Sequence, residues 1–533
     1  MELRPCFEGF AGIPQETRLV FRSLNTQDNV EMTGLINHPI RQLRPGLYRG
    51  LFGKQLTTHE AFYRMSRLAI SVKVDPLDNT FIKAFRWCEK RMRHQILSAT
   101  SMLGADIKMY DFDATEFGDF VWQSLFSKTL PASDFELIRK ARYANIRPSW
   151  EVLNRIAMAR LTSSVELGPP PRMDTRKYDI FMSQTPWPTI LSKNTQLVVR
   201  YHDAIPVFLP HTISNARIHQ ATHMAGLDIS RKTAVFACTS KATQGDLLKI
   251  YPELETRSMV IPDTVSHEYF EEKANATYVV NSIRGHICPT TEPKFLTSRE
   301  KDRFYERHLV SKPHKFLLMV STIEPRKNHS KLIAAWDFLK NHGMPDLKLV
   351  LVGELGWEYN YILDSIVAAQ EKGELFHLHR IPSGQLRILY REAAAVVCPS
   401  VAEGFDLSGI EAMLCGGVVV ASDIPVHREI YANACEYFNP YSTTDLAKAV
   451  QRVIAPEFVA RREELIELGL RHATQYRSES IRPYWHEFFE RIRVGDFKKG
   501  KKHLAGKPTA VGELEPNMNL ATEKTYSTPP AVL

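Results

Sequence analysis

The sequence has few cysteines, and no two of them have the close spacing of a CxxC motif. Seven occur among 533 residues, scattered from Cys6 to Cys435, without a CxxC pair. This sparse, odd number argues against a disulfide framework and against a structural zinc site, since both need several cysteines or histidines at characteristic spacings. We therefore expect reduced, buried thiols in a cytoplasmic protein.

Long apolar runs and a secretion signal are also lacking. No stretch of about 18 apolar residues runs without a charged residue, so we expect no transmembrane helix. The N-terminal segment has neither the basic start nor the small-residue cleavage site of a signal peptide. These absences predict a soluble protein, or one that touches a membrane only at its surface.

Charge of one sign is not in large excess, since 68 lysines and arginines stand against 60 aspartates and glutamates. The net charge of +8 permits an anionic partner, such as a nucleotide or a phospholipid, without selecting one. The basic cluster at Lys498, Lys499, Lys501 and Lys502 is short and typical of a solvated tail, so we expect no nucleic-acid partner. Hydrophobic residues make up 44% of the chain, which suits a protein of several globular domains.

Apolar strands alternate with amphipathic helices over residues 315–454. Runs such as 347–353 have strand character, and segments such as 329–340 have helical spacing. Strands that are apolar throughout are buried on both faces, which is typical of a parallel sheet covered by helices on both sides. This pattern predicts a doubly wound, Rossmann-like α/β domain over residues 315–480.

The N-terminal half is less regular but carries strand-like runs with helical stretches between them. It predicts a second Rossmann-like domain over residues 1–270, with a helical insertion. Residues 271–314 are interpreted as a linker with an insertion, 481–494 as an amphipathic helix and 495–533 as a disordered tail. Open α/β sheets bind ligands at the carboxyl ends of their strands, so two facing domains would share one cleft.

The segment SVAEGFDLSGIEAML (400–414) places Glu403 and Glu411 around a turn and the start of a helix. A helix that begins near Leu407 has free amides in its first turn, which form an anion site together with the helix dipole. Glu411 would lie roughly 6 Å along this helix. The carboxylates then flank an anion site, which suits a sugar nucleotide with Glu403 at the sugar and Glu411 at the ribose. Two surface glutamates around an ordinary turn would give the same pattern.

A second motif, MVSTIEPRKNHSKLIAAW (319–336), has a strand, then Arg326 and Lys327, then a helix. Two cations that follow a strand at this edge of the sheet could neutralise a diphosphate leaving group. An isolated Arg-Lys pair is also common at a solvated helix start.

Four segments resemble the retaining glycosyltransferases of family 4: STIEPRKN, LVLVGELGW, LYREAAAVVCPSVAEGFDLSGIEAMLCGGVVVASDIPVHREI and ACEYFNPYSTTDLAKAV. The similarity is close over residues 310–455 and looser at 7–24, 198–207 and 236–248. The resemblance implies the GT-B architecture, in which two Rossmann-like domains face each other across a cleft. It also implies a nucleotide-sugar donor bound mainly by the C-terminal domain.

The resemblance implies a role for each matching residue. Glu403 would contact the donor sugar, Glu411 the ribose, and Lys327 the diphosphate. His202 and Asp203 would lie beside the reacting centre, although a lone histidine there could equally cap a strand. The remaining residues expected at the donor site are Gly12, Ile13, Arg326, Ile381, Gly404, Phe405, Leu407 and Ser408, and Ser240 also falls on a family serine.

Two positions depart from the family pattern. Thr322 stands where the family has an arginine, and we expect Arg326 to supply the missing charge. Asp406 stands where the family usually has glycine. We expect Asp406 to tolerate a left-handed backbone, to cap the following helix and to point away from the donor phosphates.

The resemblance implies a front-face displacement without an obvious protein nucleophile, in which the leaving diphosphate helps to deprotonate the acceptor. Positioning and electrostatics would dominate catalysis. We expect no metal or other cofactor, because the sequence shows no acidic metal-binding cluster. GDP-mannose is the expected donor, with a UDP-hexose or a deoxyhexose donor left open, and the acceptor would be a glycan or a lipid-linked sugar in lipopolysaccharide or other surface polysaccharide synthesis.

Residues 81–97 and 135–160 mix cations with aromatic residues. Such faces suit an anionic membrane that presents a lipid-linked acceptor, although a solvated basic face with an apolar side in the core would look the same. Two other functions stay open: a non-catalytic sugar-nucleotide-binding scaffold and a nucleotide-sugar epimerase.

Overall fold

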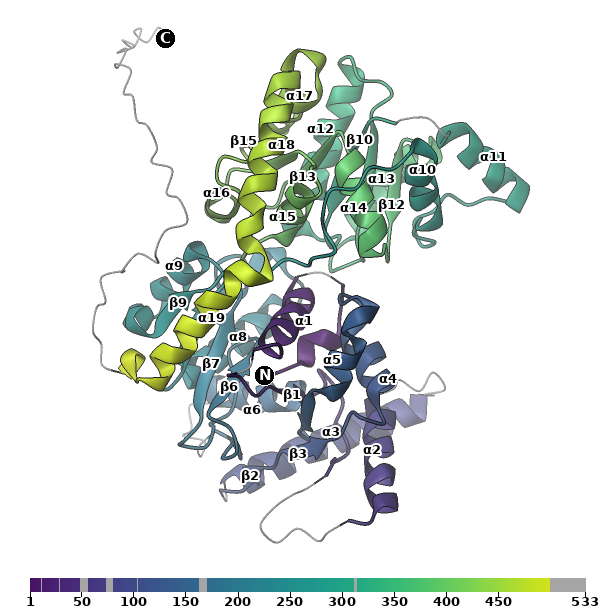
Figure 1. The fold of residues 1–533 in the computed structure, drawn as a ribbon. Helices are drawn as coiled ribbons and strands as arrows, with labels where there is room; N and C mark the ends of the chain where they lie inside the picture. Colours follow the sequence, from purple (N-terminus) through teal and green to yellow (C-terminus); the bar gives the residue numbers. More distant parts are fainter. Residues whose placement is uncertain are drawn as a thin grey trace, which may run out of the picture.

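The computed structural model shows two α/β domains, one above the other in Figure 1, with the chain passing between them near their interface. The structure describes residues 1–10, 12–27, 29–47, 56–72, 80–102, 104–162, 170–310 and 314–498. The tail expected to be disordered lies outside these residues from position 499 onward. The expected arrangement of two doubly wound domains is confirmed.

The C-terminal domain is built on a six-stranded sheet of order β12-β11-β10-β13-β14-β15, in which every neighbouring pair is parallel. The strands are β10 (Phe316–Val320), β11 (Lys348–Val352), β12 (Leu375–Leu378), β13 (Ala395–Cys398), β14 (Val419–Ser422) and β15 (Glu436–Phe438). The helices are α12 (His329–Asn341), α13 (Asn360–Glu371), α14 (Ser383–Glu392), α15 (Leu407–Leu414), α16 (Pro425–Tyr431), α17 (Thr443–Ile454) and α18 (Val459–Ala473). Their apolar residues fill both faces of the sheet, as the continuous apolar strands require.

The strand order reverses between β10 and β13. From β10 the chain winds outward through β11 and β12, and it then returns to start at β13 and winds the other way. Such a reversal is a topological switch point, where the loops at the carboxyl ends of the two strands diverge and leave room for a ligand. The loops after β10 and β13 carry the two motifs singled out in the sequence.

The N-terminal domain has a parallel sheet of order β6-β7-β8-β9 and a smaller mixed sheet of order β1-β4-β3. The first residues of the chain join them, since Glu2 pairs with Leu35 of one sheet and its amide donates to Met182 of the other. The strands are β1 (Thr33–Ile36), β3 (Tyr110–Phe112), β4 (Arg142–Asn145), β6 (Ile180–Ser183), β7 (Gln196–Tyr201), β8 (Val235–Cys238) and β9 (Ser258–Val260), with a separate pair β2 (Asp106–Ile107) and β5 (Arg172–Met173).

The expected helical insertion appears as two long helices, α2 (Thr58–Val72) and α3 (Thr80–Met102), at the end of this domain away from the C-terminal domain (Figure 1). The other helices are α1 (Ile13–Leu24), α4 (Gly118–Val121), α5 (Phe135–Lys140), α6 (Trp150–Thr162), α7 (Ile205–Phe208), α8 (Ala216–Ser230) and α9 (Lys241–Ile250). Residues 135–160 fold into α5, β4 and α6, and their apolar side is in the core, with Leu153 and Ile156 buried. This arrangement matches the alternative of a basic face with its apolar side in the core, and a membrane contact of this stretch stays a prediction.

Residues 271–314, expected as a linker with an insertion, contain two helices, α10 (Ala276–Gly285) and α11 (Ser298–His308). Each begins at a side-chain cap, from Asn275 and from Thr297. α10 packs on α14, and Ile287 bridges to the edge strand β12, so this segment extends the C-terminal domain.

The final helix, α19 (Ser478–Arg493), returns to the N-terminal domain and packs against α1 (Figure 1). It overlaps the helix expected at 481–494. The outgoing and returning chain segments are tied together where they cross between the domains. The Val265 amide donates to the Tyr476 carbonyl at 2.9 Å, and the Arg477 guanidinium donates to the carbonyls of Ser266 and Tyr269 at 2.8 and 2.6 Å.

Candidate active site

The two loops at the switch point meet in a cluster of opposite charges. The Glu403 carboxylate, in the loop after β13, accepts from Arg326 Nη1 at 2.7 Å and from Lys327 Nζ at 2.5 Å, both in the loop after β10. Arg326 also donates to Glu324 Oε1 at 2.8 Å and to the Ala402 carbonyl at 2.7 Å. The motifs that the sequence placed at one sheet edge are thus in direct contact.

The mutual attraction of the groups in this cluster favours their charged forms, although they are buried. Burial by itself would raise the pKa of Glu403, but the guanidinium of Arg326 and the ammonium of Lys327 outweigh it and hold that pKa below its usual value. The charge of Lys327 also acts on Asp406, the residue that caps α15, and lowers its pKa. An anion that reached the cluster would find two positive groups already held in place, and would compete with the Glu403 carboxylate for them.

Asp406 caps α15, as expected from the sequence. Its backbone is left-handed, with φ of 70°, and its carboxylate accepts from the Ser408 amide at 3.3 Å and the Ser408 hydroxyl at 2.6 Å. The other carboxylate oxygen lies 3.2 Å from Nε2 of His427, a buried histidine on α16. That Asp406 points away from donor phosphates stays a prediction.

His427 links Asp406 to the loop after β14. Its Nδ1 lies 2.9 Å from the carbonyl of Ser422, whose hydroxyl donates to the carbonyl of Ser400 at 2.5 Å. Its Nε2 faces the carboxylate of Asp406 at 3.2 Å. Burial opposes ionisation of Asp406, but the hydrogen bond from His427 and the charge of Lys327 hold its pKa well below the usual range. The sequence analysis missed this partner, although His427 lies within the quoted segment ASDIPVHREI.

Glu411, on α15, is buried and occupied by protein partners. Its Oε1 accepts from Gln15 Nε2 at 2.6 Å, and its Oε2 accepts from the Tyr390 hydroxyl at 2.9 Å. Burial raises the pKa of Glu411 to about 7. Gln15 belongs to α1 of the N-terminal domain, so this hydrogen bond joins the two domains. A ribose at Glu411 would have to replace these partners, and the contact stays a prediction.

His202 and Asp203 follow β7 and face the cluster from the N-terminal domain. Burial holds the pKa of His202 well below its ordinary value, so the ring is neutral, and its Nε2 lies 3.3 Å from Oε1 of Gln184. Asp203 accepts from the Ile205 amide at 3.0 Å. Burial raises the pKa of Asp203, while the positive charge of Arg326 across the interface lowers it. These residues therefore lie next to the charge cluster.

The two domains approach each other closely at Gly404. A Cβ placed on it would lie 1.9 Å from the carbonyl oxygen of His202, so only glycine fits. The Gly404 carbonyl accepts from the Ser240 hydroxyl at 2.9 Å, which places this serine at the interface. A further contact joins the Glu429 carboxylate to the amides of Lys241 and Ala242, at 2.7 and 3.0 Å, at the start of α9.

The other expected donor-site residues surround this interface in different ways. Phe405 and Leu407 are buried, and the Phe405 ring packs edge-on against Tyr476, so these two residues could meet a ligand only through their backbone. The Ile381 side chain is partly buried and packs against the hydrophobic core. Gly12 has φ of 67° at the start of α1, the conformation that favours glycine, with Ile13 next to it. Thr322, at the end of β10, is half-buried.

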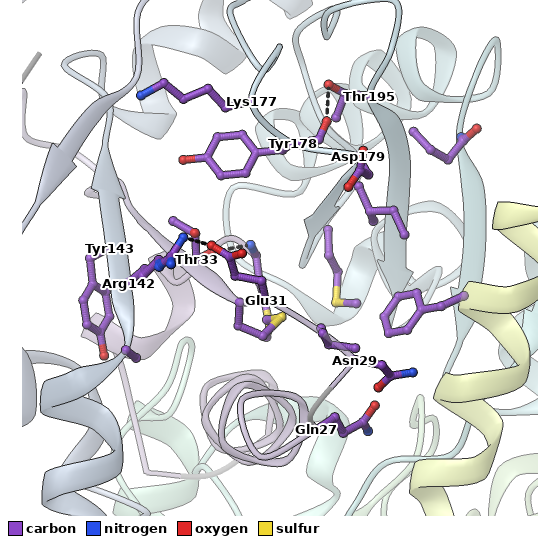
Figure 2. Close-up of a pocket in the computed structure, with 18 of the residues that line it drawn as sticks. Gln27, Asn29, Glu31, Thr33, Arg142, Tyr143, Lys177, Tyr178, Asp179 and Thr195 are labelled. Carbon is purple, nitrogen blue, oxygen red and sulfur yellow. Dashed lines mark hydrogen bonds and ion pairs between the residues drawn. The ribbon is translucent and has the colours of Figure 1, made fainter. Parts of the chain in front are cut away.

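A large cavity of about 1210 Å³ lies elsewhere, in the N-terminal domain (Figure 2). It opens beside Thr33 and Ile180, the first residues of β1 and β6, and is therefore at the sheet edge opposite the one that binds ligands in such folds. Arg142 and Glu31 form an ion pair on its wall, and the Met1 ammonium donates to the Thr33 carbonyl at 2.8 Å. Burial lowers the pKa of that ammonium to about 5. This cavity is separate from the charge cluster.

The described residues contain neither a metal-binding group of side chains nor a helix that could cross a membrane. Among those residues, no three or more His, Cys, Asp or Glu side chains are grouped so as to hold a metal ion. Within the same ranges, no helix combines the length and the apolar character needed to cross a bilayer.

Comparison with known proteins supports a glycosyltransferase domain. Residues 300–471 match the family described as "Glycosyl transferases group 1", a span that includes Arg326, Lys327, Glu403 and Glu411. The resemblance stated from the sequence is confirmed at this level, and family 4 stays a prediction.

The chain is similar to curated mannosyltransferases over part of its length. It is 36% identical over 139 residues to the serotype-specific mannosyltransferase WbdA of Escherichia coli, covering 26% of this chain and 17% of that protein. It is 26% identical over 262 residues to the O-antigen chain mannosyltransferase RfbU of Salmonella typhimurium, covering 49% of this chain and 65% of that protein. The chain thus spans less than two thirds of either relative.

Solved structures of similar proteins include Anabaena Alr3699/HepE in complex with UDP-glucose, at 18% identity and a TM-score of 0.42, covering 56% of this chain and 72% of that one. Sucrose-phosphate synthase from Thermosynechococcus elongatus matches at 19% identity and a TM-score of 0.46, covering 66% and 84%.

Proposed function

We propose that this protein is a retaining glycosyltransferase that moves a hexose from a nucleotide sugar to a glycan or lipid-linked acceptor. The observation that carries the proposal is the contact of Glu403 with Arg326 and Lys327 at the switch point of a glycosyltransferase group 1 domain. The neutral His202 and the Asp203 carboxylate face the same point from the other domain.

The donor would exchange partners within the cluster. Its diphosphate would take Arg326 and Lys327, together with the amides at the start of α15 that Asp406 does not cap. Glu403 would then be released to accept hydrogen bonds from sugar hydroxyls. This exchange would leave every charged group with hydrogen-bond partners, whereas a buried charge that lost all its partners would cost on the order of 3–5 kcal/mol.

In the proposed transfer step, one bond at the anomeric carbon of the donor sugar replaces another, and negative charge develops on the leaving diphosphate. The bond between the anomeric carbon and the diphosphate oxygen breaks, and the acceptor oxygen bonds to the same carbon on the same face. The acceptor proton passes to the departing diphosphate oxygen. Negative charge grows on the diphosphate during this step, so Arg326 and Lys327 interact more strongly with the transition state than with the bound donor. With these cations in that role, we expect no metal or other cofactor.

Mannose from GDP-mannose is the proposed donor sugar. Its support is the similarity to proteins named as mannosyltransferases, joined to the TIEPRKN and HDAIP segments of this sequence. The names of these relatives also suggest O-antigen or related surface polysaccharide synthesis, which would place the protein in the cytoplasm at the inner membrane. We propose no nucleic-acid partner.

A donor screen tests the proposal. Calorimetry and hydrolysis with GDP-mannose, UDP-glucose and UDP-GlcNAc should show one preferred donor, and Glu403→Ala should abolish turnover. Arg326→Ala should weaken binding of that donor roughly tenfold, as expected for one lost charge-assisted contact. Unchanged affinity would remove Arg326 from the site. Binding without any turnover would instead indicate a scaffold, and conversion of the sugar nucleotide without an acceptor would indicate an epimerase.

A further inference from the structure

Helix α3 exposes one apolar side of the N-terminal domain. Ile82, Phe85, Met92 and Ile96 are all exposed, and Phe85 is 70% exposed. At 100° per residue, these four positions fall within about 80° on one side of the helix, and we call them the α3 apolar face. The same side also carries Glu89, whose charge is paired with Arg93. Surface helices normally turn such a face toward the core, and a contiguous apolar face left exposed marks an interaction surface.

This exposure is not the result of a loosely packed helix, because another side of the helix holds it on the domain. Leu97 of α3 packs against the core around Phe181 and Trp187, and α3 contacts α6. The neighbouring helix α2 is anchored in the same way by Met65 and Leu68, both buried.

Aromatic and cationic side chains lie together on the exposed sides of both helices. On α2, the Arg67 guanidinium lies 5.6 Å from the ring centre of the exposed Tyr63. On α3, the Arg91 guanidinium lies 5.4 Å from the ring centre of the exposed Trp87. Aromatic rings and long cationic side chains each combine an apolar body with a polar end, which suits the boundary between lipid headgroups and acyl chains.

The net positive charge of α3 favours an anionic bilayer over a second copy of this chain as the partner that covers the α3 apolar face. The helix has five basic residues and one acidic residue, Glu89, which is paired with Arg93. An apolar face flanked by positive charge is complementary to an anionic bilayer. A second copy of this chain packed through the same face would bring two positively charged helices together, which is unfavourable.

We propose that α2 and α3 dock this protein on an anionic lipid bilayer, with the α3 apolar face inserted at the headgroup boundary. Both helices lie at the end of the molecule away from the C-terminal domain (Figure 1), so docking leaves that domain unobstructed. The docking needs no sugar nucleotide, and its test is separate from that of the transfer activity.

Vesicle co-sedimentation of the full chain tests the proposal. The protein should bind vesicles of phosphatidylcholine that contain about a quarter phosphatidylglycerol, and it should bind far less to pure phosphatidylcholine. Raising the salt from about 0.05 M to about 0.5 M should weaken binding, because the Debye length shortens from about 14 Å to about 4 Å. Absence of binding to the anionic vesicles would overturn the proposal.

Two variants locate the surface. Replacing Phe85, Met92 and Ile96 together by serine should weaken binding at least a hundredfold, with unchanged melting temperature and donor hydrolysis. Neutralising Arg67 and Arg91 by glutamine removes two charges without touching the α3 apolar face. It should weaken binding about 30-fold, from roughly fivefold per charge.

A matched control uses the C-terminal domain, where Val367, Tyr441 and Val459 are also exposed apolar residues. Their joint replacement by serine should leave binding unchanged. Wild-type binding by the α3 serine variant would overturn the proposal. So would a dimer, seen by light scattering, that dissociates in that variant, because the face would then be covered by a second copy.

Discussion

Replacing Asp406 by glycine is expected to destabilise the protein rather than to improve donor binding. The carboxylate caps α15 through Ser408 and pairs with the buried His427, and the backbone there is left-handed. Glycine adopts the left-handed conformation without strain, which stabilises the folded protein by about 1 kcal/mol. As a helix cap it is less stabilising than aspartate by only about a few tenths of a kcal/mol. It also leaves the buried His427 ring without its partner, and breaking a buried pair costs about 3–5 kcal/mol.

The net effect is therefore a loss of about 2–4 kcal/mol in the free energy of unfolding. For a domain of this size each kcal/mol lowers the melting temperature by about 2–4 °C, so thermal unfolding followed by circular dichroism should shift down by about 4–16 °C. Since the folded-state pKa of Asp406 is depressed, the stability contributed by this carboxylate is complete above about pH 4 and declines as the pH falls through the folded pKa. The difference in the free energy of unfolding between the wild type and Asp406→Gly should therefore become smaller at low pH.

Two variants separate the causes. In Asp406→Asn, the new side chain can still cap α15 and tolerates a left-handed backbone, but the negative charge is gone. This variant should therefore be destabilised nearly as much as Asp406→Gly. Asp423→Asn breaks an exposed pair with Arg428, whose atoms lie 2.6 Å apart, and should change stability by less than about 1 kcal/mol. An Asp406→Gly protein as stable as wild type, or one that binds donor much more tightly, would refute the reasoning.

Four further perturbations test the site. Gly404→Ala places a methyl group against the His202 carbonyl and should lower kcat/KM about a hundredfold in a folded protein; wild-type rates would show that the domain contact is not needed for turnover. Gln15→Ala removes a hydrogen bond that lowers the pKa of Glu411, so the pKa should rise above its value of about 7, seen as a shift of the donor-binding pH profile to higher pH. In the wild type, the raised pKa of Glu411 makes stability fall as pH rises from about 4.3 to about 7, and Glu411→Gln should remove that fall in urea titrations. Turnover should survive excess EDTA, and its loss would show that a metal ion is required.

The elements of the C-terminal domain could be predicted from the sequence because their determinants are local. Continuous apolar runs mark strands buried on both faces, and the start of α15 at Leu407 follows from the glycine turn and the cap at Asp406. The same local signals placed Arg326, Lys327 and Glu403 at one sheet edge, where the structure brings them into contact.

Contacts between distant segments were not predictable in this way. Gln15 and Glu411 are 396 residues apart in the chain, and no local pattern indicates that α1 and α15 meet. The partner of Asp406 was missed for a related reason, since His427 reaches it only through the packing of α16. Mixed cationic and aromatic composition likewise did not distinguish the buried stretch 135–160 from the exposed α3, because burial depends on tertiary placement.

The double crossing of the chain between the domains limits how they can move apart. The outgoing segment at Val265 and the returning segment at Tyr476 and Arg477 are hydrogen-bonded side by side, so the two connections behave as one pivot. Sliding the domains apart would have to stretch both connections and break these bonds. Rotation about the pivot moves Gly404 away from His202 while leaving the pivot intact. An opening of this kind would break the Gln15–Glu411 hydrogen bond, and closing would form it again between the same two atoms.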